Sequence, residues 1–148
     1  MKQLPEEKTV RLIRELLDVP GGGIQIVLLG GPEEAGMNQR IKKHFGSEIF
    51  DAGSHNGIRH YAAIVSGCNL VLTGDTLAMH VALAMGRKVV ALFGPTSPWE
   101  IELFGLGEKI VTGLECVACY RRVCQRSPNC MDAITTEVIK GAIIRHLG

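Results

Sequence analysis

The sequence predicts an α/β fold in which an open parallel sheet carries helices on both faces. Two observations lead to this prediction: short apolar runs bounded by glycine recur along the chain, and segments with helical periodicity separate them. Strands joined by helices in this way are linked by right-handed crossovers and lie parallel in one sheet. The 148 residues are 46% hydrophobic and 21% charged, so they suit one domain, residues 1–148, with a packed core.

The first half of the chain is expected to hold helices and strands in alternation. Apolar residues at helical spacing between Val10 and Leu17 predict a helix over 5–18, and the glycines that follow Pro20 end it. The run 24–29 is almost continuously apolar, which is typical of a strand buried on both faces. The further predicted elements of this half are a helix at 34–45, a strand at 48–51 and a helix at 57–66.

The second half continues the alternation with two strongly apolar runs. Residues 69–73 and 88–93 predict buried strands, each followed by glycine, and a helix of small residues over 76–85 separates them. Residues 110–111 are expected to form a last short strand. Thr135 is a suitable N-cap for the C-terminal helix that closes the chain. This order of elements predicts a Rossmann-like sheet.

Charge and hydropathy argue against nucleic acid and against insertion in a membrane. The 16 basic and 15 acidic side chains leave a net charge of +1, so no field over the whole domain attracts a nucleic-acid backbone. No apolar run reaches the roughly 20 residues that span a bilayer. The first turns of the chain are too charged for a signal peptide. We therefore expect a cytoplasmic protein with no transmembrane segment.

Polar, glycine-containing segments follow four of the predicted strands. In open α/β sheets, ligands bind beyond the carboxyl ends of the strands, so these segments form the candidate site. We expect them to converge on one edge of the sheet, although the last of them could be only a rigid turn. They are residues 30–34, 53–56, 74–76 and 94–96.

The segment from Thr73 to His80 carries the strongest indication of chemistry. A strand ends there at glycine and a helix starts at once, and the backbone N–H groups of a helix start favour a diphosphate. Thr76 and His80 lie four residues apart on one helix face, within reach of a phosphate or a sugar hydroxyl. Asp75 suits a ribose or sugar hydroxyl. The structural alternative is that Asp75 caps the helix and His80 packs against the sheet.

Four of the five cysteines gather in one loop, residues 116–130. Four thiolates so close together could hold a structural zinc ion or an iron–sulfur cluster, although the spacing departs from the paired knuckles of zinc ribbons. Two disulfides are one alternative, and reduced thiols that pack an irregular loop are another. The four residues are Cys116, Cys119, Cys124 and Cys130.

Several of these segments together resemble one known family. Asp75-Thr76-x-x-x-His80, followed by a strand and a Phe-Gly-Pro-Thr turn, is similar to the donor-site region of the heptosyltransferases of lipopolysaccharide biosynthesis, glycosyltransferase family 9. The opening from Lys2 and the Gly-Gly-Pro-Glu-Glu segment before Ala35 resemble two upstream motifs of that family, and some members carry the cysteine cluster. The resemblance covers nearly the whole chain, and the ordered set of motifs is more specific than any one of them.

The resemblance implies a donor site for a nucleotide diphospho-sugar. It implies that Lys2 meets the donor phosphates and that one of Glu33 and Glu34 binds the ribose hydroxyls. The loop around Asn56 is expected to contact adenine through backbone groups. As alternatives, Lys2 is solvated and the two glutamates only favour a helix start. The residues implied to line the diphosphate-sugar are Asp75, Thr76, Leu77 and His80.

Two positions depart from the family motifs. Leu77 stands where the family has glycine, which adds bulk where the donor approaches the backbone, and Leu4 replaces a tryptophan of the opening motif. Gly74, just before Asp75, partly restores the flexibility of the loop. Neither departure removes a charged group, but together they bear on the identity of the donor.

The resemblance implies the C-terminal, donor-binding half of a GT-B type glycosyltransferase. The expected reaction moves a sugar, with ADP-heptose as the implied donor, to the lipopolysaccharide core and needs no cofactor. The acceptor and the general base are expected on an N-terminal acceptor domain that this chain lacks, so the chain alone is expected to be inactive. Peripheral association with the inner membrane is compatible with such an acceptor.

Two functions of other classes compete with this interpretation. A dehydrogenase is disfavoured because no predicted strand is followed by Gly-x-Gly-x-x-Gly. The second alternative is a non-catalytic α/β module that binds a metal ion or a partner through the cysteine loop. Metal analysis and nucleotide titration separate these functions.

Overall fold

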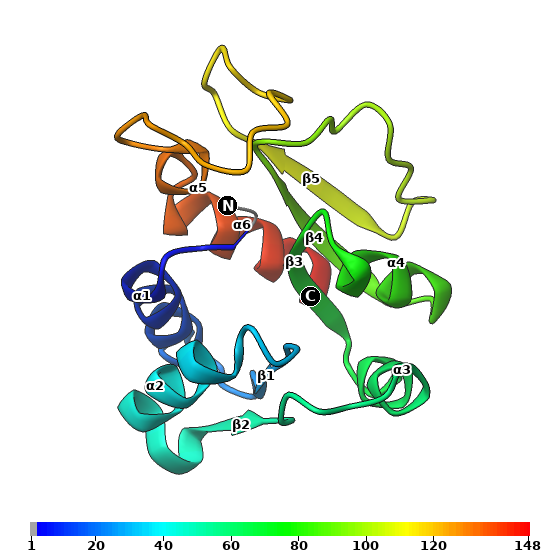
Figure 1. The fold of residues 1–148 in the computed structure, drawn as a ribbon. Coiled ribbons are helices and arrows are strands. Elements are labelled where there is room, and N and C mark those ends of the chain that lie inside the picture. Colours follow the sequence, from blue (N-terminus) through cyan, green and yellow to red (C-terminus); the bar gives the residue numbers. More distant parts are fainter. Residues whose placement is uncertain (1–2) are drawn as a thin grey trace. The chain divides into compact units, whose positions relative to one another are not determined.

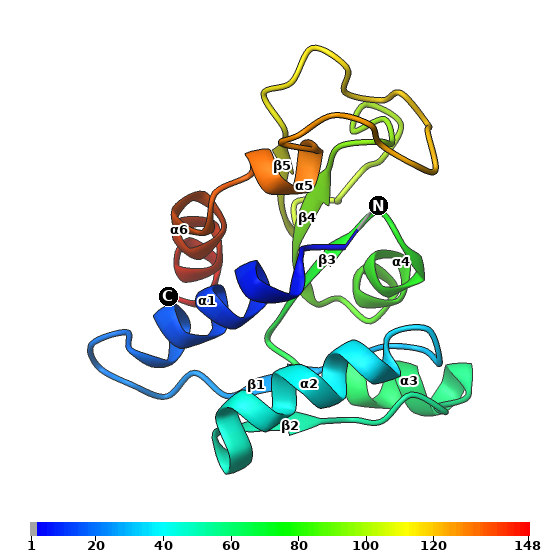
Figure 2. The ribbon, with the colours of Figure 1, turned by 60° about the vertical axis from the view of Figure 1, so that its left-hand side comes forward.

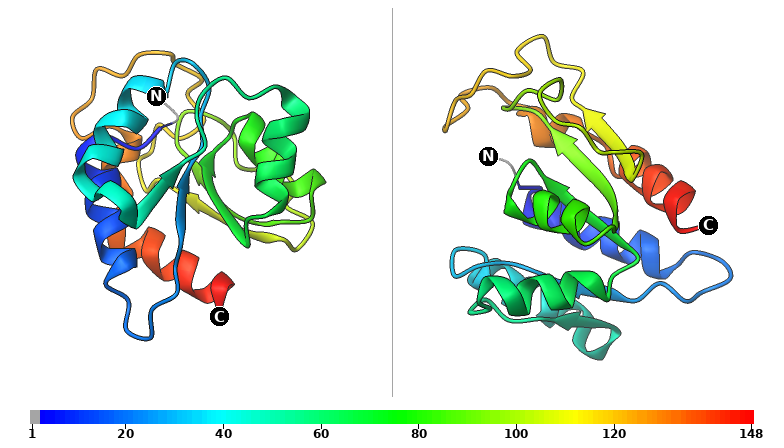
Figure 3. Two further views of the ribbon diagram at one scale, coloured as in Figure 1. Left: turned by 90° about the horizontal axis from the view of Figure 1, so that it is seen from below. Right: turned by 90° about the vertical axis from the view of Figure 1, so that its right-hand side faces the viewer.

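The computed structural model describes residues 3–148, which form two compact units (Figures 1 and 3). The first unit comprises residues 6–64, and the second comprises residues 3–5 and 65–148. Each unit contains its own hydrogen-bonded parallel sheet, so the five strands are not one continuous ladder. All helices and strands predicted from the sequence are present, most of them slightly shorter than expected.

The first unit consists of three α-helices and a two-stranded sheet. Its elements in chain order are α1 (Glu6–Leu17), β1 (Ile26–Leu28), α2 (Ala35–Phe45), the 3₁₀ turn Gly46–Glu48, β2 (Ile49–Asp51) and α3 (Ile58–Ser66), whose last two residues belong to the second unit. Strands β1 and β2 pair in parallel, with Leu28 opposite Asp51. Both strands therefore end at the same edge of this small sheet.

The core of the first unit lies between α1, α2 and one face of its sheet. Ile13, Leu28, Ile41, Phe45 and Ile49 are buried together there, and an ion pair between Arg40 and Glu6 joins the two helices at 2.8 Å. The other face of the strands is open: Val27 is 37% exposed and Phe50 is 54% exposed. The prediction that run 24–29 is buried on both faces is therefore wrong, because this ladder is only three residues long and helices cover a single face.

The second unit is built on a three-stranded parallel sheet in the order β3-β4-β5. The strands are β3 (Leu70–Gly74), β4 (Lys88–Phe93) and β5 (Gly107–Val111). Helix α4 (Leu77–Ala84) packs on one side of β3 and β4, and helix α6 (Thr136–Leu147) packs on the other (Figure 2). This arrangement of helices on both faces of a parallel sheet confirms the predicted fold class.

The central strand β4 is almost entirely buried. Residues 89–93 have exposed fractions of 3% or less, as expected for a strand with neighbours on both sides and helices on both faces. Strand β5 is longer than the predicted pair 110–111. It begins at Gly107, where φ is 155° and a β-carbon would lie 1.8 Å from the carbonyl oxygen of Val89. Only glycine lets β5 approach β4 so closely at this point.

A short helix, α5 (Cys130–Ala133), was not predicted. Asn129 is its N-cap and accepts hydrogen bonds from the backbone N–H groups of Met131 and Asp132. The Asp132 carboxylate in turn accepts from the backbone N–H of Asn129, which completes a capping box. This box fixes the end of the cysteine loop and buries Cys130 and Met131.

None of the helices within residues 3–148 is long and apolar enough to cross a bilayer.

Candidate functional site

The loops that follow β3 and β4 lie at the same edge of the second unit's sheet. Gly74 pairs with Leu92 in the parallel register, so residues 74–76 leave the sheet next to residues 94–98. The loops that follow β1 and β2 are likewise neighbours at one edge of the first unit's sheet. The convergence of all four segments on a single surface stays a prediction, since the structure brings them together only as one pair in each unit.

The loop after β3 leads directly into the first turn of α4. Thr76 occupies the N-cap position in extended conformation, but its side chain makes no capping hydrogen bond and lies 3.0 Å from the hydroxyl of Thr73. Asp75 precedes the N-cap, so the alternative in which Asp75 is the capping residue does not match the observed helix start. Thr76 and Leu77 are exposed, the latter by 63%. The start of α4 thus faces solvent.

His80 lies one turn into α4 and is also exposed. Its neighbour Met79 is fully buried and packs into the core instead, so the alternative in which His80 packs against the sheet is wrong. His80 lines a groove of about 500 Å³ beside α4. Sequence reasoning missed the residues on the other wall of this groove because they lie in an irregular segment without periodicity. They are Glu100, Ile101, Glu102 and Phe104.

The two glutamates before α2 have different surroundings. Glu34 is half-buried, and its Oε2 accepts a hydrogen bond from the backbone N–H of Gly31 at 2.8 Å. Glu33 is exposed. Gly30 allows this tight turn, because a β-carbon there would lie 2.6 Å from Cβ of Glu34. The Glu34 carboxylate therefore stabilises its own loop, whereas that of Glu33 faces solvent.

The loop after β2 is closed by the side chain of Asn56. Its Nδ2 donates to the carbonyl oxygens of Ala52 and Gly53 at 2.9 and 3.1 Å, and the Asp51 carboxylate accepts from the N–H of Gly53. The Asn56 side chain is thus engaged within the loop, and the contact of this loop with adenine stays a prediction. Lys2, which the family resemblance assigns to the donor phosphates, lies outside the described residues.

The five cysteines are all present as free thiols. Within residues 3–148, no three His, Cys, Asp or Glu side chains are grouped so that they could hold a metal ion, so the present arrangement of Cys116, Cys119, Cys124 and Cys130 does not form a ligand set. Burial raises the pKa of the Cys130 thiol, and the nearby Cys124 and Cys119 raise it further. A zinc site at this loop therefore stays a prediction that metal analysis must test.

A model of glycosyltransferase family 9 (heptosyltransferase) matches residues 2–129. The chain belongs to this family. Lipopolysaccharide heptosyltransferase 2 of Escherichia coli K12 is 28% identical over 101 residues, which are 66% of this chain and 28% of that protein. Lipopolysaccharide heptosyltransferase 1 of E. coli O18:K1:H7 is 28% identical over 141 residues, which are 94% of this chain and 37% of the relative.

Solved structures of this family have the same fold. The structure of E. coli ADP-heptose lps heptosyltransferase II matches 99% of this chain with a TM-score of 0.76 and 21% identity. The E. coli heptosyltransferase WaaC with ADP matches 98% of the chain with a TM-score of 0.70 and 25% identity. The chain spans 42% and 40% of these two proteins, so it corresponds to less than half of each.

Proposed function

We propose that the chain is the donor-binding half of a heptosyltransferase that moves a sugar from a nucleotide diphospho-sugar, ADP-heptose, to the lipopolysaccharide core. The observation that carries the proposal is the exposed start of α4 after Gly74, where the Asp-Thr-x-x-x-His motif of a family 9 member lies. Support also comes from the WaaC structure, which was solved with ADP and matches nearly the whole chain.

In this proposal, backbone N–H groups at the start of α4 bind the diphosphate. N–H groups of the first helical turn have no acceptor within the helix and carry a partial positive charge, which stabilises an anion by about 0.3–1 kcal/mol at an exposed site. Thr76 adds a hydroxyl at the same point, and Asp75 accepts a hydrogen bond from a sugar hydroxyl. His80 reaches the sugar or a phosphate from the next turn. Leu77 is exposed and packs against the donor.

The remaining donor contacts are proposed for the first unit and for Lys2. One of Glu33 and Glu34 binds the ribose hydroxyls. Glu33 has the exposed carboxylate, and Glu34 retains one oxygen besides the one that accepts from Gly31. Backbone groups of the loop that Asn56 closes contact the adenine, and the Lys2 ammonium pairs with a phosphate.

The general base is assigned to a second domain that also binds the acceptor. A base must lie within hydrogen-bond reach of the acceptor hydroxyl, on the side opposite the donor. In this proposal the carboxylates and the imidazole of the site contact the donor. The chain alone is therefore proposed to bind donor without transferring sugar.

Isothermal titration of the chain with ADP, AMP and NAD tests the proposed function. We expect ADP to bind more tightly than AMP, because AMP lacks the second phosphate, and more tightly than NAD, because the loops lack the dinucleotide fingerprint. Equal affinity for ADP and NAD, or no binding of ADP, would contradict the proposal.

A further inference from the structure

The loop after β4 is buried although it lies at the exposed edge of the sheet. Of its residues, Thr96 alone is half-buried. The cysteine segment, residues 116–131, lies above the carboxyl ends of β4 and β5 and contacts Gly94 and Pro95 of this loop (Figure 1). This loop is the neighbour of residues 74–76, to which the proposed function assigns the diphosphate. The buried residues of the loop are Gly94, Pro95, Ser97 and Pro98.

Two backbone hydrogen bonds tie the cysteine segment to this loop. The N–H of Ala118 donates to the carbonyl oxygen of Gly94 at 2.9 Å, and the N–H of Tyr120 donates to that of Pro95 at 2.7 Å. Ala118 and Tyr120 have φ values of 59° and 54°, in the left-handed region that residues other than glycine rarely adopt. The surrounding contacts must hold these strained conformations in place.

The strongest steric relationship joins Gly94 to the end of the segment. A β-carbon on Gly94 would lie 2.4 Å from Sγ and 2.6 Å from Cβ of Cys130, and 3.0 Å from Cε of Met131. The capping box of α5 fixes the first helical turn, to which Cys130 belongs. The thiol of Cys130 therefore fills the space that the missing side chain of Gly94 leaves.

The far end of the same loop is held as well. Nζ of Lys109 on β5 donates to the carbonyl oxygen of Pro98 at 2.7 Å and also to that of Ile101. The hydroxyl of Tyr120 donates to the Glu100 carboxylate at 2.9 Å, which links the cysteine segment to the wall of the groove beside His80. The loop is thus fixed at both ends and cannot shift without breaking several contacts.

We propose that residues 116–131 form a clamp that positions residues 94–98 beside the diphosphate loop 74–76, with Gly94 and Cys130 as its central contact. Its consequence for ligand affinity rests on the proposed function, whereas the clamp itself is a property of the fold. Cys130 is a positioning residue in this account and touches no substrate. The chemistry of the clamp is packing and backbone hydrogen bonding, so it requires neither a metal ion nor a disulfide.

The substitution Gly94→Ala tests the clamp, with Gly113→Ala as its matched control. A β-carbon at position 94 displaces Cys130, whereas one at Gly113 has no atom within 4 Å and is not at positive φ. Adding Cys130→Gly to Gly94→Ala removes both atoms that clash most closely. We expect Gly94→Ala to weaken ADP binding about fivefold or more, the double variant to recover most of this loss, and Gly113→Ala to change nothing, because residues in contact couple at this level.

Two readouts keep the clamp and the proposed function separate. The first is the affinity for ADP, measured well below the melting temperature of each variant. If the contact between Gly94 and Cys130 only stabilised the fold, this affinity would stay unchanged. The second is amide hydrogen exchange at Ala118 and Tyr120, which we expect to accelerate in Gly94→Ala and to recover in the double variant. If Gly94→Ala does not fold, Cys130→Gly alone must weaken ADP binding and accelerate the same two amides.

The outcomes are distinct. No binding of ADP by the unsubstituted chain overturns the proposed function, and the exchange measurement then decides the clamp alone. Binding of ADP together with identical behaviour of Gly94→Ala and Gly113→Ala in both readouts overturns the clamp and leaves the proposed function intact.

Discussion

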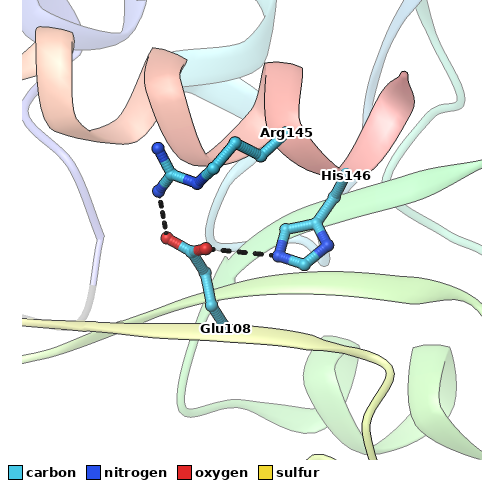
Figure 4. Close-up of polar contacts among 3 residues, drawn as sticks. All are labelled: Glu108, Arg145 and His146. Atoms are coloured by element: carbon cyan, nitrogen blue, oxygen red, sulfur yellow. Dashed lines mark hydrogen bonds and ion pairs between the residues drawn. The ribbon is translucent and has the colours of Figure 1, made fainter.

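Nη2 of Arg145 lies 2.7 Å from Oε1 of Glu108, so the last turn of α6 is tied to strand β5 (Figure 4). Nε2 of His146 lies 3.3 Å from the other oxygen of the same carboxylate. The hydrogen bond from Arg145 lowers the pKa of Glu108, and the charge of Arg145 and the contact with His146 lower it further. Basic residues in the last turn also interact favourably with the helix dipole.

Replacement of Glu108 by glutamine is expected to destabilise the chain slightly and in a pH-dependent way. The Arg145 side chain is 61% exposed and that of Glu108 is 32% exposed, so solvent screens the pair and we expect a loss of about 0.5 kcal/mol at pH 7. A lowered folded-state pKa stabilises the protein above the ordinary pKa of 4.5, and this contribution disappears as the pH falls through the folded-state value. Urea unfolding of both proteins between pH 3 and 7 checks the trend. A difference that persists undiminished at pH 3 would contradict this assignment.

Thr112→Val is expected to stabilise the second unit. Within residues 3–148, the hydroxyl of Thr112 at the end of β5 is buried and has no hydrogen-bond partner, and the residue is only 6% exposed. A buried unsatisfied hydroxyl costs about 1–3 kcal/mol, and valine has nearly the same shape, so we expect a gain of about 1 kcal/mol. Thermal unfolding measures it, with Thr135→Val, which removes a helix cap, as a control of opposite sign. A loss of stability in Thr112→Val would mean that a bound water or ligand group uses the hydroxyl.

The second unit could be predicted from sequence more completely than the first. The sequence runs that form β3 and β4 are apolar because helices cover both faces of their sheet. The apolar pattern of these runs therefore matches the burial of the strands. The run before Gly30 looks similar but forms only a three-residue strand with exposed Val27, because its sheet has one covered face. The apolar character of the individual residues does not distinguish a strand whose sheet is covered on both faces from one whose sheet is covered on a single face.

The parts of the candidate site that contain sequence motifs could be predicted, whereas the parts without a motif could not. The start of α4 and the exposure of His80 follow from a strand that ends in glycine before a helix. The groove wall around Glu100 and Phe104 lies in a segment without periodicity, and only the tertiary structure brings it to α4. The capping box at Asn129 is present in the sequence as Asn-x-x-Asp, but it overlaps a cysteine cluster whose pattern favours a metal-binding loop over a helix start.

Asp75→Ala and His80→Ala are expected to weaken ADP-sugar binding without unfolding the protein. Both side chains lie at or near the exposed start of α4, and Thr76 rather than Asp75 occupies the N-cap position, so their removal leaves the core unchanged. In a full-length enzyme that contains this domain, we expect the same changes to reduce donor turnover. Titration and thermal unfolding are measured together. A lower melting temperature, consistent with roughly 1 kcal/mol, with unchanged binding would instead mean that Asp75 acts as a cap.

The thiols of the reduced chain are expected to fall into two classes of reactivity. The thiolate is the reactive form, and burial raises the pKa of both Cys130 and Cys68, so these two should be alkylated more slowly than Cys116, Cys119 and Cys124. Mass spectrometry after timed alkylation of anaerobically prepared protein provides the order. Protection of all four cysteines of the loop, with about one zinc per chain by elemental analysis, would support a metal-bound loop instead.

The central claim is that a nucleotide diphosphate binds at the start of α4, and an ¹H–¹⁵N correlation spectrum recorded during titration with ADP tests it most directly. The account predicts that the amide signals of Asp75, Thr76, Leu77 and Ala78 move progressively and reach saturation, because their N–H groups lie at the exposed helix start. It also predicts that signals at the distant end of α6, around Arg145, stay in place. Saturating ADP that leaves the signals of residues 75–78 unmoved would contradict the claim.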